Sequence, residues 1–241
     1  MTENILVQRP EFVREVESSA FGVVEKPLTT YEKIFNNAAV RKGILLVLLA
    51  AIWQTYATVL QNPLLFPRFS ETFGAFYENI MNGVLLQRGW FSIKVLLMGY
   101  FSGMFLASVL TALAITSRVG NDLLETLTAM FNPLPAIALL PLALIWFGLG
   151  YGSLVFVLIH SVLWPVALNT HSGFLSVSQT MRMVGRNYGL SGPRYVMKIL
   201  IPAAFPNILT GMKIGWAFAW RTLIAAELVF GVSSGSGGLG W

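Results

Sequence analysis

The sequence predicts an all-α membrane protein with about five membrane-spanning helices. Of its 241 residues, 55% are hydrophobic and only 11% are charged, which gives a mean hydropathy of +0.67. A soluble domain of this size needs more polar surface. Several apolar stretches also reach the roughly 18 to 20 residues with which a helix crosses a hydrocarbon core of about 30 Å while satisfying its own backbone.

The amino-terminal segment, residues 1–42, is expected to lie outside the membrane. Thr29 and Glu32 have the spacing of a capping box, in which each side chain binds the backbone of the other residue. This pattern predicts a helix that runs through Ile34 and Val40 into the membrane, with its first part at the interface.

Residues 43–241 are expected to form one membrane domain. Its predicted spans are residues 43–60, 93–116, 125–147, 153–170 and 206–230. The loop at 61–91 carries a helical apolar spacing from Phe73 to Leu86, which predicts a surface helix outside the membrane.

The third predicted span contains Pro133, Pro135 and Pro141. Each proline lacks a backbone donor, so this helix must start late, kink, or line a cavity. Glycines at 148, 150 and 152 then predict a tight turn into the fourth span.

The segment 171–205 is polar and basic, and no acid occurs between Glu125 and Glu227. It predicts an elbow of two helices: the first at 182–188 stops at a left-handed Gly189, and the second, capped by Ser191, runs to Leu200 and ends before Pro202 and Pro206. Its apolar residues would make a poor free surface, so a soluble partner subunit is expected to cover them. These residues are Met183, Tyr188, Leu190 and Tyr195.

Lys and Arg predict the orientation, because positively charged loops stay in the cytoplasm. Eleven lie on one side of the predicted spans and three on the other, which places the amino terminus and the elbow in the cytoplasm. The eleven are Arg9, Arg14, Lys26, Lys33, Arg41, Lys42, Arg118, Arg182, Arg186, Arg194 and Lys198, and the three are Arg68, Arg88 and Lys94.

Several chemistries are disfavoured by composition. The chain has no cysteine and only two histidines, so disulfides, thiolate metal sites and a zinc site are not expected. The net charge of +5 reflects topology rather than nucleic-acid binding. No phosphate-binding Gly-Lys-Ser/Thr loop, paired carboxylates or Ser–His pair indicates an enzyme, and no catalytic residue is assigned.

Polar residues inside the spans are the candidates for a transport pathway, since such residues are costly in lipid. Arg221 either faces an aqueous or anion-bearing cavity or bonds another helix. His160 and Trp164 share a helix face, and His160 either faces a substrate path or bonds a neighbouring helix. Glu227 either belongs to the path or reaches the outer interface, whereas Lys213 is expected to extend to the membrane surface.

The elbow carries Gly189, then nine residues, then Ile199, one residue, Ile201 and Pro202. This spacing resembles the ATPase-coupling motif of binding-protein-dependent ABC importer permeases, which then also includes Met183, Val184, Gly185 and Arg186. Other segments resemble the nitrate, sulfonate, taurine and bicarbonate branch of that family. They are 133–136, 140–142, 146–150, 168–170, 210–215, 225–227 and 237–240.

The resemblance implies a transport subunit in the bacterial inner membrane that carries a small anionic solute. His160, Trp164, Asn169, Arg221 and Glu227 are then the candidate pathway residues. It also implies separate ATP-binding cassette subunits, a second permease subunit as in a homodimer, and an external solute-binding protein. ATP and Mg²⁺ would bind the partner ATPase, with no cofactor or metal in this chain.

Two departures from the family pattern are visible. Met183, Val184 and Gly185 replace the usual Glu-Ala-Ala that opens the motif, so the usual acidic contact to the ATPase is missing. The family has a sixth span after the Gly-Leu-Gly turn, which is expected to be absent from this sequence.

An ion-coupled secondary transporter is the alternative function, with its coupling site at the proline-broken third span and at Arg221 or Glu227.

Overall fold

The computed structural model describes residues 29–230 and 237–240, and every regular element in these ranges is helical. The predicted all-α class is confirmed. The chain divides into two compact units, Met1–Gly74 and Ala75–Trp241, which are described one at a time.

In the first unit, the predicted capping box is present. Thr29 accepts a hydrogen bond from the Glu32 backbone, and its own N–H donates to the Glu32 carboxylate at 2.8 Å. The backbone N–H and hydroxyl of Thr29 together lower the pKa of Glu32 below its ordinary value. Helix α1 spans only Thr30–Asn36, so the prediction of one helix through Val40 is wrong.

Asn37 explains the break. Its backbone is extended (φ −72°, ψ 115°), and its side-chain oxygen accepts a hydrogen bond from Ala39 N–H at 2.9 Å. Asparagine competes well for such capping positions. A new helix, α2, therefore begins there and spans Ala38–Leu60, where the first membrane span is predicted.

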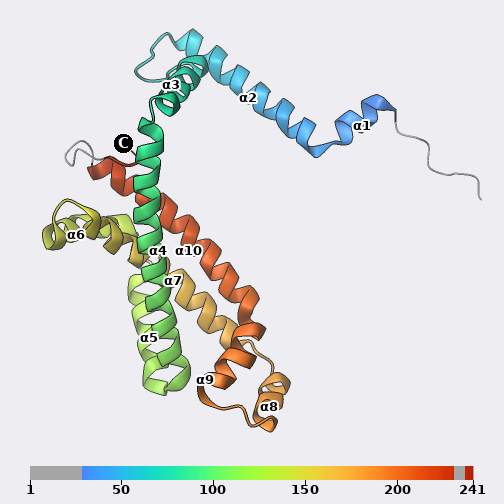
Figure 1. Ribbon diagram of the computed structural model, residues 1–241, viewed down its shortest axis with the longest axis vertical. Helices are drawn as coiled ribbons and strands as arrows, with labels where there is room; N and C mark the ends of the chain where they lie inside the picture. Colours follow the sequence, from blue (N-terminus) through green and yellow to red (C-terminus); the bar gives the residue numbers. More distant parts are fainter. Residues whose placement is uncertain (1–28, 231–236, 241) are drawn as a thin grey trace, which may run out of the picture. The chain divides into compact units, whose positions relative to one another are not determined.

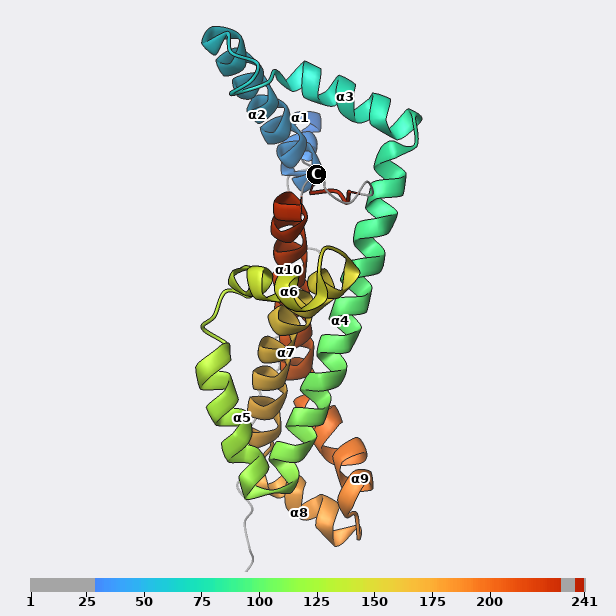
Figure 2. The same cartoon turned by 90° about the vertical axis from the view of Figure 1, so that its left-hand side faces the viewer.

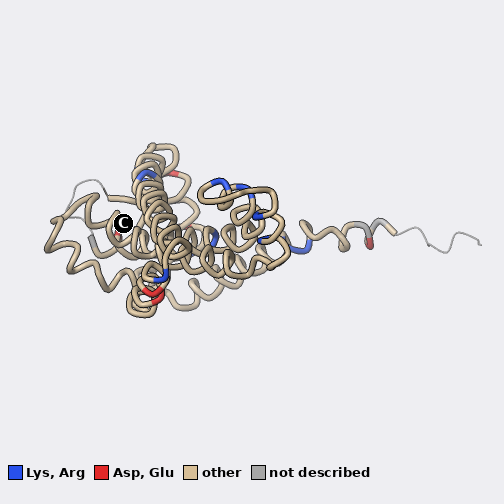
Figure 3. The backbone as a smooth tube through the Cα atoms, turned by 90° about the horizontal axis from the view of Figure 1, so that it is seen from below, with Lys and Arg blue, Asp and Glu red and all other residues tan. Residues whose placement is uncertain are grey.

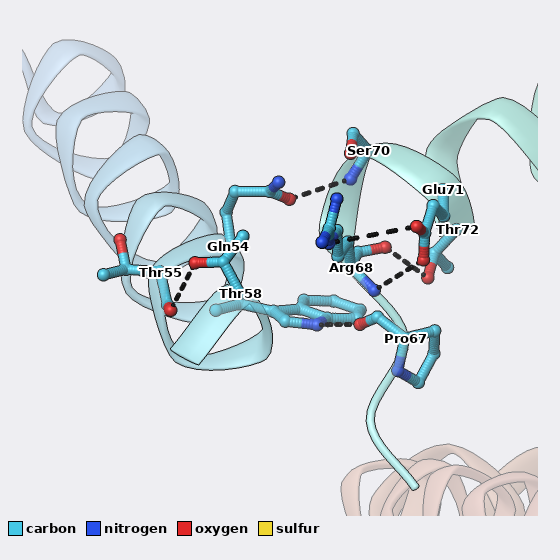
Figure 4. A network of polar contacts seen from close by, with 9 residues as sticks. Gln54, Thr55, Thr58, Pro67, Arg68, Ser70, Glu71 and Thr72 are labelled. Carbon is cyan, nitrogen blue, oxygen red and sulfur yellow. Dashed lines mark hydrogen bonds and ion pairs between the residues drawn. The ribbon is translucent and has the colours of Figure 1, made fainter. Parts of the chain in front are cut away.

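The end of α2 is joined to the start of α3, Phe69–Met81, by side-chain bonds (Figure 4). Trp53 Nε1 donates to the Pro67 carbonyl at 2.9 Å, and the Ser70 N–H donates to Gln54 Oε1 at 3.1 Å. The surface helix predicted for 73–86 thus exists but starts and ends earlier.

The second unit is built on three long helices, α4 (Val84–Thr116), α7 (Tyr151–Leu175) and α10 (Ile201–Phe230). They pack side by side along much of their length (Figures 1 and 2). Residues such as Val95, Val157 and Leu223 are fully buried between them.

Small residues bring these helices close together. A Cβ on Gly99 of α4 would lie 2.3 Å from Leu158 of α7, and a Cβ on Gly103 would lie 2.8 Å from Val162 of the same helix. On α10, Gly211 packs against Asn169 and the Pro165 carbonyl of α7. Both pairs, 99/103 and 211/215, have the four-residue spacing with which small residues line helix crossings in membranes.

The third span is broken, as its prolines predict. Helix α5 covers Arg118–Phe131, and after a turn at Pro133 and Pro135 the chain continues as η2 (Ala136–Leu139) and α6 (Leu140–Phe147). The bend between the two parts is 87°, visible in Figure 2. In the described ranges, four helices are long and apolar enough to cross a membrane, or five if the bent pair counts as one span.

The last span differs from the prediction at its start. A short α9 (Gly192–Tyr195) continues through the π-helix η3 (Val196–Leu200) into α10, so Pro202 and Pro206 lie inside helix and do not separate the elbow from the span. The Ile201 N–H donates to the Val196 carbonyl, five residues back. Such local π adjustments re-satisfy the backbone groups that a proline leaves unpaired.

Candidate functional site

The elbow begins with α8, Gln179–Asn187, where the first elbow helix is predicted. Gly189 follows with φ +69°, and its N–H donates to the Arg186 carbonyl at 2.9 Å. The Leu190 N–H donates to the Gly185 carbonyl at 3.0 Å, which completes a Schellman motif. The predicted left-handed stop is confirmed, whereas Ser191 holds its N-cap position without a side-chain bond.

One face of α8 is fixed to the bundle. Gly185 is buried, and a Cβ there would lie 2.9 Å from both Ile199 and Tyr195. Arg182 donates to the carbonyls of Phe174 at 2.6 Å and Val177 at 3.1 Å, at the end of α7. Gly185, the smallest residue of the coupling motif, therefore lies where side chains of the second elbow helix come closest to α8.

The other face of α8 is exposed and apolar. Met183 is 55% exposed, Val184 40% and Tyr188 81%. Figure 3 looks toward this end of the bundle and shows blue Lys and Arg positions along the α8–α9 segment. Of the other predicted coupling residues, Ile201 and Pro202 lie in the first turn of α10, and Arg186 lies on the face turned toward the bundle with Arg182 and Gly185.

A second feature lies where the third span breaks. Residues 132–137 at the break, together with α7 and α10, line a cleft of about 370 Å³. Three of the five predicted pathway residues, His160, Trp164 and Arg221, meet there.

Aromatic rings lie at this cleft: Trp164, His160 and Phe218 line it, and Phe131 packs on Trp164 next to it. Trp164 is stacked on Phe131 at the end of α5, with 5.6 Å between ring centroids and an interplanar angle of 8°. The His160 ring meets both of them edge to face. The prolines that end α5 thus place its last aromatic residue against α7.

Arg221 is the one formally charged residue among those that line the cleft. It is exposed, and its guanidinium lies 5.4 Å from the centre of the Phe218 ring. Within the described ranges, no carboxylate forms an ion pair with it. A guanidinium held over an aromatic ring keeps its hydrogen-bond donors available for an anion.

The remaining two pathway candidates lie elsewhere. Asn169 donates to the Pro165 carbonyl at 2.7 Å and packs against Gly211 where α7 crosses α10. Glu227 is only 3% exposed and accepts hydrogen bonds from Ser92 and from the Gly240 backbone. Neither lines the cleft.

Sequence reasoning missed several contributors. Phe131 and Phe218 lie in apolar stretches, where nothing in the sequence distinguishes them from other hydrophobic residues. Ser92 was not paired with Glu227 because 135 residues separate them. The Gly99/Gly103 and Gly211/Gly215 spacings were available signals of helix crossings.

Comparisons with known proteins decide the family. Residues 99–240 match the family of binding-protein-dependent transport system inner membrane components. The chain belongs to this family. It is therefore a multi-pass membrane protein and a permease subunit of an ABC importer. The match includes the cleft, the elbow and Glu227, whereas Ser92 precedes it.

Relatives that are named as transport permeases support the same family. The chain is 31% identical over 194 residues to the taurine transport system permease protein of Escherichia coli, covering 78% of this chain and 70% of the relative. It is 28% identical over 207 residues to the nitrate import permease protein of a Synechocystis species, covering 82% and 74%. An aliphatic sulfonates transport permease of Bacillus subtilis is 31% identical over 204 residues, covering 81% and 71%. These similarities place the chain in the branch that the motifs indicated.

Proposed function

We propose that this permease carries a small organic or inorganic anion and is driven by a separate ATPase that binds the exposed face of α8. The observation that carries the proposal is the division of α8 into two faces. Gly185 and Arg182 hold one face on the bundle, while Met183, Val184 and Tyr188 leave an apolar face uncovered.

Such a face fits a hydrophobic groove on a partner, the usual way in which an amphipathic helix is recognised. Because Met183 replaces the acidic residue usual in the family, contact at this point would be apolar rather than ionic. Methionine adapts its shape readily to a groove. Gly189 and the bonds that flank it would transmit movement of α8 to η3 and α10 as one piece.

The topology of this proposal follows the basic residues. The elbow carries Arg182, Arg186, Arg194 and Lys198 and no acid, so it would lie in the cytoplasm together with the amino terminus. ATP and Mg²⁺ would bind the cytoplasmic ATPase. A second permease subunit, an identical copy in the simplest case, would complete the pathway, and an external solute-binding protein would deliver the solute.

The solute class rests on the cleft at the broken third span. Arg221 supplies one positive charge, with Asn132, Ser161 and Thr222 as polar groups nearby. Nitrate, taurine, other sulfonates and bicarbonate each carry oxygen atoms that a guanidinium can bind. The names of the relatives support nitrate, taurine and aliphatic sulfonates within this range of anions.

Copurification tests the proposal. The full chain, solubilised in detergent from its native host, should retain an ATP-binding cassette subunit that mass spectrometry identifies. Cells shown to make the intact chain but yielding no ATPase would instead favour an ion-coupled secondary transporter. Uptake that follows a proton gradient in the absence of ATP would point the same way.

A further inference from the structure

A second cleft, of about 920 Å³, lies at the elbow end of the bundle. The ends of α4 and α7, the beginning of α5 and the inner face of the elbow line it. None of its lining residues lines the cleft that contains Arg221. From His160 to His171, which lie on α7 beside the two clefts, the helix rises about 16 Å, so the clefts are separate sites.

Arginines supply most of the charged groups of this elbow cleft. Arg118 comes from the first turn of α5, and Arg182 and Arg186 come from α8, against a single acid, Asp122. Arg182 is bound to carbonyls of the α7 end. The guanidinium groups of Arg118 and Arg186 have no hydrogen bond or ion pair with any residue that the structure describes.

The rest of the wall is apolar. Ile115 near the end of α4, Phe174 near the end of α7 and Leu200 of η3 line the same cleft. Phe174 and Leu200 are buried, and Ile115 packs against them. The cleft therefore joins a cationic rim to an apolar interior, beside the ends of two membrane-spanning helices.

We propose that this elbow cleft binds the headgroup of an anionic phospholipid, with its phosphodiester on Arg118 and Arg186 and its glycerol and upper acyl carbons against the apolar wall. Guanidinium groups bind phosphate through paired hydrogen bonds. Basic pockets between membrane helices on the cytoplasmic side suit anionic lipid headgroups. The proposal rests on the proposed function only in that it places this cleft on the cytoplasmic side of the membrane.

An ATPase is a poorer occupant of this cleft. Met183, Val184 and Tyr188 are exposed and none of them lines this cleft, so the face proposed for the ATPase is separate from it. A lipid bound here would bridge the first turn of α5 and the coupling helix α8. Since α5 ends at the Arg221 cleft, the lipid would help to hold the distance between the coupling and transport sites.

Native mass spectrometry of the full chain tests the proposal. The chain is released from micelles doped with dioleoyl phosphatidylglycerol or dioleoyl phosphatidylcholine, and the retained lipid is counted. We expect preferential retention of phosphatidylglycerol, reduced about tenfold by the double substitution Arg118→Gln/Arg186→Gln, because charged hydrogen bonds are lost. The matched control is Arg88→Gln/Lys94→Gln, which removes two cations from the other end of α4 and should change nothing.

Three results would overturn the lipid site: equal retention of the two lipids, unchanged retention by the Arg118/Arg186 variant, or displacement of phosphatidylglycerol by inorganic phosphate at equal concentration. The last would assign the cleft to free phosphate. If the double variant fails to elute as a folded species, Arg118→Gln and Arg186→Gln are measured singly. No ATPase is present in this experiment, so its outcome is independent of the proposed coupling.

Discussion

Glu227 on α10 and Ser92 on α4 are joined by a 2.6 Å hydrogen bond in which the serine hydroxyl donates to the carboxylate. Both residues are buried. The Leu239 N–H donates to the same hydroxyl, and the Gly240 N–H donates to the other carboxylate oxygen, both at 2.8 Å. This buried network ties residues 239 and 240 to two bundle helices, which accounts for an acid in an otherwise apolar helix.

Ser92→Ala should lower the free energy of unfolding by about 1–3 kcal/mol, because it leaves the buried carboxylate and the Leu239 N–H short of a partner. Thermal unfolding in detergent measures the change. Ser108→Ala is the matched control on α4, since Ser108 is exposed and donates only to its own helix at Met104. Equal effects of the two substitutions would contradict the structural role given to the network.

Gly189→Val should uncouple transport while the chain still inserts and folds. A Cβ at this position meets no neighbouring atom, so the penalty comes from the φ of +69° alone. Gly189→Asn is the control, because asparagine tolerates this conformation better than other residues with a side chain. The ratio of solute taken up to ATP hydrolysed should fall for valine and change little for asparagine; unchanged coupling in both would count against the elbow.

Arg221→Gln should raise the KM for uptake about tenfold or more, because the cleft loses its one formal charge and a charged hydrogen bond to the anion. Uptake of labelled nitrate, taurine or an alkanesulfonate by the native complex gives the readout. Lys213→Gln removes another cation from α10, but Lys213 is exposed and does not line the cleft. Similar KM values for both variants would contradict a role for Arg221 in binding the solute.

Gly103→Leu should destabilise the crossing of α4 and α7. Even a Cβ there would lie 2.8 Å from Val162, and overpacking of this kind costs about 1–3 kcal/mol or more. Gly43→Leu is the comparison, since no atom lies within 4 Å of a Cβ at Gly43. Thermal unfolding should separate the two variants clearly; an equal loss would argue against close helix contact at Gly103.

Local signals in the sequence predicted much of this architecture. The Thr29–Glu32 cap, the Gly189 stop and the proline break of the third span each depend on neighbouring residues, and each is present. The prediction that the elbow helix ends before Pro202 was wrong, because the π-helix Val196–Leu200 accommodates the proline, which has no backbone donor, and the helix continues. The Val40 prediction failed because Asn37 caps a new helix.

Long-range contacts were harder to foresee. Nothing near Glu227 in the sequence points to Ser92, and nothing near Gly185 points to Tyr195 and Ile199 as the side chains that pack over it. His160, Trp164 and Arg221 could be proposed together because polar residues in apolar spans are costly. Asn169 was grouped with them for the same reason, yet it lies at a helix crossing.

Cross-linking from α8 tests the central claim most directly. The chain contains no cysteine, so Met183→Cys provides a single attachment point for a benzophenone maleimide in native membranes. We predict that illumination joins this position to an ATP-binding cassette subunit, whereas Val59→Cys, exposed near the end of α2, yields no such product. Labelled Met183→Cys chains that never cross-link to an ATPase, in cells that retain uptake, would contradict the account.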